Sequence, residues 1–158
     1  MSDMLVKLYH LEEAYSVEHL KEKGIAIKRV LSPDNHLVQK FIRDHFSEAW
    51  VSEVSVALNK VNPTCFIAIH EQKVIGFAAY DATAKGFFGP TGVNENYRGY
   101  GVGAALLMKS LLAMRDEGYG YAIIGGVGKA RPFYEKVCHA INIEETDPTV
   151  YSRMVGYN

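Results

Sequence analysis

Short apolar runs with strand character dominate the middle of the chain. Two of them, residues 64–70 and 73–80, are separated only by Glu71-Gln72. Two such runs joined by two residues predict a β-hairpin. Residues 87–93 follow after a small polar turn and predict the third strand of an antiparallel meander. Pro90 lies inside this third run, and because proline cannot donate to a strand ladder, it predicts an edge or a bulge there.

Before the hairpin, the pattern alternates between strand spacing and helical spacing. Strands are predicted at residues 4–11 and 24–31, with a short helix between them that starts near Ser16. Ser32-Pro33 combines a capping residue with a first-turn proline and predicts the start of a longer helix. Ser47 predicts the start of another, whose apolar stripe consists of Trp50, Val51, Val54 and Leu58.

After the meander, Val102 opens the strongly helical segment VGAALLMKSLLAMRDE, and residues 119–125 read as a buried strand. Strand, helix and strand in this order predict a parallel βαβ unit. Pro132 opens a last helix, and residues 141–143 and 149–151 predict two short closing strands. The pattern therefore predicts an α/β (α+β) fold: a central mixed sheet of about seven strands, an antiparallel meander followed by the βαβ unit, and four to five helices.

Composition and charge narrow the class of protein. With 158 residues, 48% of them hydrophobic and 22% charged, the chain resembles one soluble domain over residues 1–158, with residues 1–24 as an N-terminal extension that the pattern defines least. A net charge of −1 predicts no nucleic-acid partner and no membrane partner. The longest uncharged stretch, residues 118–128, is too short to span a bilayer. The N-terminus lacks the pattern of a secretory signal, so we expect a cytoplasmic protein.

The two cysteines, Cys65 and Cys138, are far apart in the sequence and form no C-x-x-C pair. In a cytoplasmic protein this predicts two reduced thiols, one in a strand and one at a helix end. No second cluster of ligands accompanies Cys138-His139, so we expect no metal site.

A glycine-rich turn joins the third meander strand to the long helix. Gly99, Gly101 and Gly103 alternate there and let a ligand approach the backbone, while the first helical amides and Arg98 provide positive charge. This combination predicts a phosphate or pyrophosphate site. The dinucleotide motif G-x-G-x-x-G fails because Leu106 occupies the third glycine position, and the chain has no nucleotide P-loop sequence.

The segment R-G-Y-G-V-G resembles the pyrophosphate loop [QR]-x-x-G-x-[GA] of the GNAT acyltransferase superfamily, which Arg98, Gly101 and Gly103 match in register. Val93 matches the valine that ends the fourth strand of that family. The sequence FYEK at residues 133–136 matches its downstream F-Y-x-K signature. The order GPTGV, YRGYGVG, YAIIGG and FYEK is similar to that of a single-domain bacterial branch.

The resemblance implies acetyl-CoA as the acyl donor and no metal. It implies that the donor is bound by the end of the strand, the glycine loop and the exit of the next strand: Thr91, Gly92, Val93, Arg98, Gly99, Tyr100, Gly101, Val102, Gly103, Ala104 and Gly126. It further implies that Tyr134 gives a proton to the departing thiolate.

Two departures from the family pattern concern the chemistry. Many relatives carry a carboxylate on the strand that residues 87–93 occupy here, and this strand has none. The general base therefore stays open, with Glu95 beyond the strand, and His70, Glu71 and Asp81 as candidates through water. Without a dedicated base, turnover should still rise above about pH 8 as the amine loses its proton. The asparagine that many relatives place six residues before F-Y is Val127 here.

The resemblance implies an N-acyltransferase that moves an acetyl group from acetyl-CoA directly to an amine. A small-molecule amine is the expected acceptor, ahead of an amine on a protein. An acyl-CoA-binding regulatory domain without turnover is the alternative. Tyr134 favours the enzyme, and the strand without a carboxylate keeps the alternative open. A homodimer is compatible with either reading.

Overall fold

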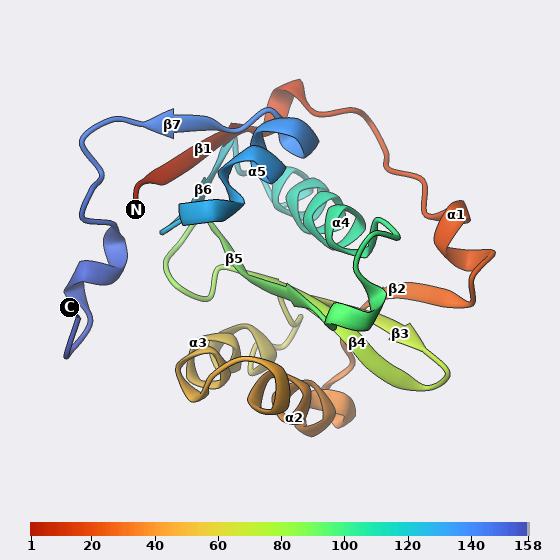
Figure 1. Ribbon diagram of the computed structural model, residues 1–158. Helices are drawn as coiled ribbons and strands as arrows, with labels where there is room; N and C mark the ends of the chain where they lie inside the picture. The colour runs from red at the N-terminus through yellow and green to blue at the C-terminus, as the bar shows by residue number, and fades with distance from the viewer. Residues whose placement is uncertain (158) are drawn as a thin grey trace.

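A seven-stranded mixed sheet runs through the protein in the order β2-β3-β4-β5-β6-β1-β7 (Figure 1). The computed structural model describes residues 1–157. The strands are β1 (Asp3–Lys7), β2 (Ile25–Arg29), β3 (Cys65–His70), β4 (Lys73–Tyr80), β5 (Phe87–Val93), β6 (Tyr121–Ile124) and β7 (Ile141–Ile143). The helices are α1 (Glu18–Lys21), α2 (Asn35–His45), α3 (Glu48–Leu58), α4 (Val102–Asp116) and α5 (Arg131–Cys138).

The strand connections confirm the expected fold class. Strands β2 to β5 form an antiparallel meander. Strands β5 and β6, which precede and follow α4 in the chain, pair in parallel. The β3–β4 hairpin turns at Glu71 and Gln72, whose φ angles of 50° and 63° are the left-handed values that a two-residue turn of this type requires. The meander and the βαβ unit therefore both exist as predicted.

Helices cover both faces of the sheet. Figure 1 shows α2 and α3 on one face and α4 and α5 on the other. Alternation along β4 builds the two cores: Phe77 and Ala79 are buried with α2 and α3, while Ala78 and Tyr80 are buried with α4. Because successive strand residues point to opposite faces, one strand serves both layers.

The helix starts follow the capping residues, with one shift. Ser47 caps α3, and its hydroxyl accepts a hydrogen bond from the Trp50 amide at 3.2 Å. Ser32-Pro33 begins a 3-10 turn (Ser32–Asp34) that leads into α2, so the regular helix starts at Asn35. A Ser-Pro start followed by a tight first turn is a common entry into a helix.

The N-terminal residues are part of the sheet. β1 pairs antiparallel with both β6 and β7, and the side chains of Met4, Val6 and Leu8 are fully buried. Residues 1–24, which we expected to form an N-terminal extension, therefore provide an interior strand of the sheet, between β6 and β7. Pairing between strands that lie about 120 residues apart has no signature in a local pattern.

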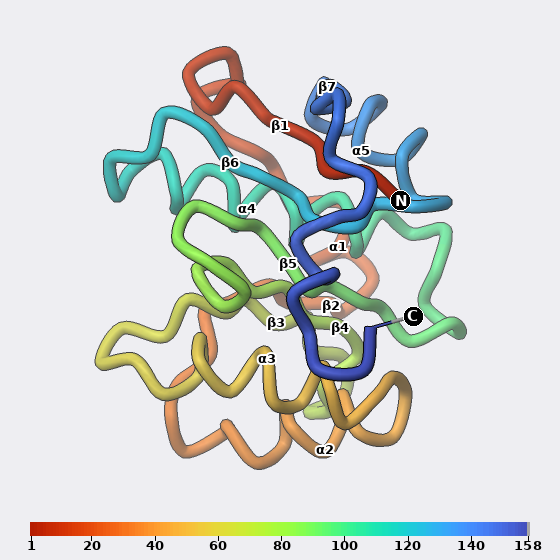
Figure 2. The backbone as a smooth tube through the Cα atoms, turned by 90° about the vertical axis from the view of Figure 1, so that its left-hand side faces the viewer, coloured from red at the N-terminus to blue at the C-terminus, as the bar shows by residue number. Residues whose placement is uncertain are grey.

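One predicted strand is wrong. Val150 and Tyr151 belong to a 3-10 turn, η5 (Val150–Arg153), which follows Thr149 and in which the Ser152 amide donates a hydrogen bond to the Thr149 carbonyl. Val150 and Tyr151 pack against Gly125 and Gly126 instead of joining a sheet edge. Figure 2 shows the C-terminal segment running from β7 across the strands toward the α3 side of the sheet.

Cys65 and Cys138 are buried free thiols, as expected from their positions in β3 and at the end of α5. Burial raises the pKa of the Cys65 thiol to about 12 and that of Cys138 to about 11, so both remain protonated and unreactive. Within residues 1–157, no helix combines the length and the apolar composition that crossing a membrane requires.

Candidate active site

The opening between β5 and β6 sets the position of the site. The two strands pair only at Phe87↔Ile123 and Phe88↔Ile124, so β5 runs on beyond its parallel partner. On its other side, the β4–β5 register shifts between Ala78 and Tyr80. This irregularity lies opposite Pro90 and confirms the predicted bulge. The residues of β5 beyond Phe88 therefore have no β6 partner and face a gap in the sheet.

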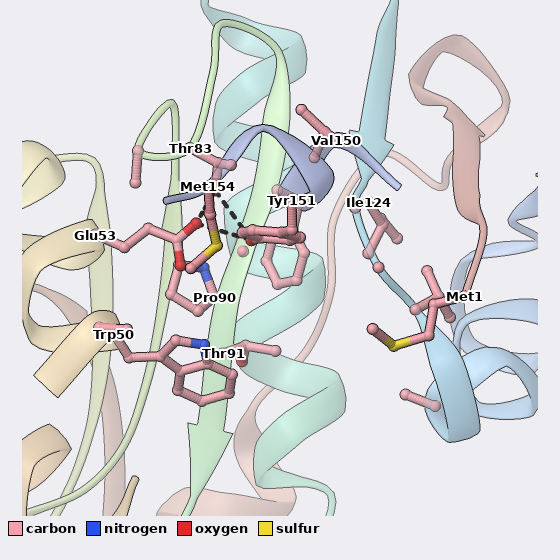
Figure 3. Close-up of a pocket in the computed structure, with 18 of the residues that line it drawn as sticks. Met1, Trp50, Glu53, Thr83, Pro90, Thr91, Ile124, Val150, Tyr151 and Met154 are labelled. Carbon is pink, nitrogen blue, oxygen red and sulfur yellow. Dashed lines mark hydrogen bonds between the residues drawn. The ribbon is translucent and has the colours of Figure 1, made fainter. Parts of the chain in front are cut away.

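A cavity of about 820 Å³ begins at this gap (Figure 3). One wall consists of Phe88–Thr91 on β5, the β6 exit Ile124–Val127, and Tyr134 on α5. The other wall consists of α3, through Trp50 and Glu53, and of the C-terminal turn. Segments from distant parts of the sequence thus line one cavity.

The glycine loop is shaped for an anion. Gly99 and Gly101 have φ angles of +89° and +85°, which glycine adopts without strain. Gly101 is the N-cap of α4, no side chain caps the first helical amides, and the first turn contains no acidic residue. A Cβ atom at Gly99 would meet no atom within 4 Å, so the loop surface is open. Unpaired amides at the positive end of a 15-residue helix fit a pyrophosphate.

The loop, the end of β5 and α5 meet at Gly103. A Cβ atom there would lie 3.7 Å from Cγ2 of Val93 and 3.8 Å from the ring of Phe133. The predicted donor residues of β5 and of the loop therefore form one continuous surface. Arg98, Gly99 and Tyr100 are exposed on it, and Thr91 lines the cavity at its other end.

Tyr134 lines the cavity from the first turns of α5, with 7% of its surface exposed. Burial, with a smaller contribution from Cys138, raises the pKa of its phenol to about 12. Its ring packs edge-on against Phe88 and Phe133. The hydroxyl therefore keeps its proton at neutral pH, as a proton donor must.

The sequence profile of the Acetyltransferase (GNAT) family matches residues 26–140, about three quarters of the chain. The chain belongs to the GNAT acetyltransferase family. No curated protein sequence is a significant match to it.

Solved structures share the fold at low sequence identity. The GCN5-related N-acetyltransferase from Sphaerobacter thermophilus superposes with a TM-score of 0.68 at 18% identity, over 90% of this chain and 48% of that one. The glucosamine N-acetyltransferase region of a fungal multi-domain GH3 β-N-acetylglucosaminidase gives 0.69 at 12% identity, over 90% of this chain and 19% of that one. An Escherichia coli GNAT family N-acetyltransferase in complex with CoA gives 0.50 at 21% identity, over 60% of this chain and 58% of that one. This GNAT chain thus spans less than half the length of each of the first two proteins.

Two residues of this GNAT domain that are predicted to bind acetyl-CoA already contact other parts of the protein. The Gly126 amide donates to Oδ1 of Asp3 at 2.8 Å, so any contact from Gly126 to a ligand would use its carbonyl oxygen. The backbone of Gly92 touches the ring of Phe46, which would lie 2.3 Å from a Cβ atom at that position. Val127, which stands where many GNAT relatives have asparagine, is buried in the cavity wall.

The four candidate bases lie outside the cavity lining. His70 Nδ1 is 2.7 Å from the Tyr97 hydroxyl, at the hairpin end of β3. Asp81 accepts hydrogen bonds from the Tyr119 hydroxyl at 2.6 Å and from the Gly86 amide at 2.7 Å. Glu71 is in the hairpin turn, and Glu95 begins an exposed 3-10 turn. None of these carboxylates or imidazoles adjoins Tyr134 in the cavity.

Sequence reasoning missed the carboxylate that does line the cavity. Glu53 lies on α3, and its Oε2 atom accepts hydrogen bonds from the Thr83 hydroxyl at 2.6 Å and from the Tyr151 hydroxyl at 2.8 Å (Figure 3). The available signal was its spacing of three residues from Trp50, which places both on one helix face. Within residues 1–157, no three His, Cys, Asp or Glu side chains gather as a metal site would require.

Proposed function

We propose that this GNAT domain transfers an acetyl group from acetyl-CoA to a primary amine of a small molecule. The observation that carries the proposal is the cavity itself, which is lined by the stretch of β5 without a β6 partner, by Tyr134 and by Glu53. A donor site and a second polar site facing one cavity are what a direct transfer between two substrates needs.

The residues that would hold the donor form the surface from Thr91 to Ala104. The amides at the start of α4, with the loop glycines and Arg98, would bind the pyrophosphate, and Thr91, Gly92 and Val93 would pair with the pantetheine arm. Acetyl-CoA supplies an activated thioester, and the β5 backbone near Val93 would polarise its carbonyl. In this proposal Gly126 lines the acetyl-CoA site and leaves room for the ligand because it has no side chain.

Tyr134 would supply the proton for the departing thiolate. Its raised pKa keeps the hydroxyl protonated, and its environment contains no carboxylate or cation in hydrogen-bond contact. The C-terminal turn forms part of the cavity lining, and this added wall favours a small molecule over a folded protein as the acceptor. The regulatory-domain alternative rests on the absence of a carboxylate from β5, and Glu53 on the facing wall weakens that argument.

A release assay tests the proposal. Purified protein with acetyl-CoA and a panel of small amines should release free CoA only when an amine is present, and the acetylated amine should be detected by mass. Binding of acetyl-CoA should raise the melting temperature by mass action. Intact donor binding with no CoA release across the panel would favour the regulatory domain.

A further inference from the structure

Glu53 is a carboxylate in the cavity that forms no ion pair with the described residues. Its side chain is half-buried, and both hydrogen bonds that it accepts come from neutral hydroxyls, those of Thr83 and Tyr151. The ion pairs formed by residues 1–157 involve none of its atoms. A carboxylate in such a place is stabilised when a cation joins it.

One oxygen of this carboxylate is left for a ligand. The hydroxyls of Thr83 and Tyr151 both donate to Oε2 and hold that oxygen in place. Oε1 accepts no hydrogen bond from the described residues. It is also not completely buried, so a ligand can reach it. Figure 3 shows Glu53 reaching from α3 toward the C-terminal turn, with Trp50 and Pro90 beside it.

The surroundings of Glu53 are largely apolar. Trp50, Pro90, Val150 and Met154 line the same cavity. Attraction between opposite charges is stronger there than in water because the local dielectric is lower. This environment suits an ammonium group attached to an aliphatic body.

We infer that Glu53 binds the ammonium group of an alkylamine acceptor through Oε1 and removes the proton that its nitrogen must lose before it attacks the thioester. This inference rests on the proposed function and names its acceptor class and its base. Thr83 and Tyr151 are positioning residues, because they act only by holding the carboxylate.

The proton balance of the transfer then closes. Glu53 takes one proton from the ammonium group and passes it to solvent, so that the nitrogen lone pair is free to attack the thioester carbon. The new C–N bond forms, the C–S bond breaks, and the thiolate takes the hydroxyl proton of Tyr134. The nitrogen still carries one surplus proton, which returns to the Tyr134 phenolate and leaves a neutral amide.

Other ionisable groups line the same cavity. They are Tyr134 and Tyr151, whose pKa values burial raises, Arg153, and Met1, whose amino group pairs with Asp147 at 3.2 Å. Because their pKa values are raised, both tyrosines stay neutral across the range from pH 6 to about pH 7.5. A difference in slope between wild type and Glu53→Gln over that range therefore does not come from either phenol.

The test compares Glu53→Gln with wild type on two kinds of amine at neutral pH. One is a primary alkylamine, which is a cation at that pH, and the other is an arylamine, which is uncharged and needs no prior deprotonation. We expect Glu53→Gln to lower kcat/KM for the alkylamine by about 100-fold or more, and for the arylamine by less than about fivefold. In the variant, kcat/KM for the alkylamine should rise about tenfold per pH unit toward the pKa of the amine, while wild type rises less steeply.

Glu48→Gln is the matched control, because Glu48 is on the same helix but pairs with Arg43 outside the cavity lining. Equal losses with both amines, or no loss with the alkylamine, would overturn the role of Glu53 while leaving the transfer reaction intact. If wild type binds acetyl-CoA but transfers to neither amine, the proposed function and this inference both fail. Melting temperatures of the variants show whether each has folded, and Glu53→Asp, which keeps the charge, should recover part of the alkylamine activity.

Discussion

The Asp3 carboxylate accepts a hydrogen bond from the Thr149 hydroxyl at 2.7 Å, although the two residues are 146 positions apart. The same oxygen, Oδ1, also accepts the Gly126 amide at 2.8 Å. Asp3 is only 7% exposed. One carboxylate therefore joins the N-terminal strand, the exit of β6 and the C-terminal segment at the edge of the cavity.

Asp3→Ala should destabilise the fold and loosen the C-terminal turn. It would leave the Gly126 amide and the Thr149 hydroxyl buried without partners, which should lower the free energy of unfolding by about 1–3 kcal/mol. Urea denaturation gives that change, and limited proteolysis near residues 150–154 reports the turn. Glu144→Ala removes an exposed carboxylate as the control. An unchanged midpoint with unchanged protease resistance would show that Asp3 does not hold the turn.

Gly103→Ala should separate donor binding from folding. The added Cβ would lie at ordinary contact distances of 3.7 and 3.8 Å from its neighbours, so the fold should tolerate it, yet the methyl group would cover the amides at the start of α4. We expect affinity for acetyl-CoA to fall about tenfold or more, by loss of close approach to the backbone. Calorimetric titration measures this. Gly120→Ala, where a Cβ would meet nothing within 4 Å, is the control, and equal binding by both variants would rule out the glycine loop as the phosphate site.

Tyr134→Phe should reduce turnover and leave donor affinity unchanged. Loss of a general acid typically costs about 10²–10⁴-fold. The control is Tyr121→Phe, an exposed phenol at the start of β6. Steady-state kinetics with a reactive amine and acetyl-CoA calorimetry give the two quantities. Wild-type turnover in Tyr134→Phe would remove this residue from the mechanism.

The raised pKa of Tyr134 predicts the alkaline behaviour. Burial raises it to about 12, so the neutral phenol is favoured by the folded state. Its contribution to stability is therefore complete below the unfolded value of about 10 and is lost as the pH rises from about 10 to 12. The rate should show no alkaline decline due to this hydroxyl below about pH 10. A decline that sets in near pH 8 in wild type and is absent from Tyr134→Phe would contradict the assignment.

Tyr151→Phe should weaken alkylamine turnover without abolishing it. Glu53 would lose one of its two donors and keep Thr83, and a hydrogen bond to a charged group is worth about 1.5–3 kcal/mol. We expect kcat/KM for an alkylamine to fall about tenfold or more, with the pH slope still shallower than in Glu53→Gln. Tyr157→Phe, in the same segment but outside the cavity lining, is the control. A Tyr151→Phe profile as steep as that of Glu53→Gln would mean that Tyr151 takes part in the proton transfer directly.

Local pattern was sufficient for most of the fold. The β3–β4 hairpin, the bulge at Pro90 and the start of α4 follow from residues next to each other in the chain, because turn geometry, missing donors and helix caps are local effects. The glycine loop is also a local feature, since Arg98, Gly101 and Gly103 share one turn. For these elements the sequence by itself determined both the structure and the expected ligand chemistry.

Only the tertiary structure decided where β1 lies and how the second wall of the cavity is built. β1 lies between β6 and β7 through pairings over about 120 and about 140 residues, respectively. The turn at Tyr151 replaces a predicted strand because it packs on Gly125 and Gly126. Glu53 meets Tyr151 across 98 residues. Such contacts depend on which faces of the helices and the sheet pack together. Hydrophobic packing is non-directional, so no spacing in the sequence predicts which polar residues it will bring into contact.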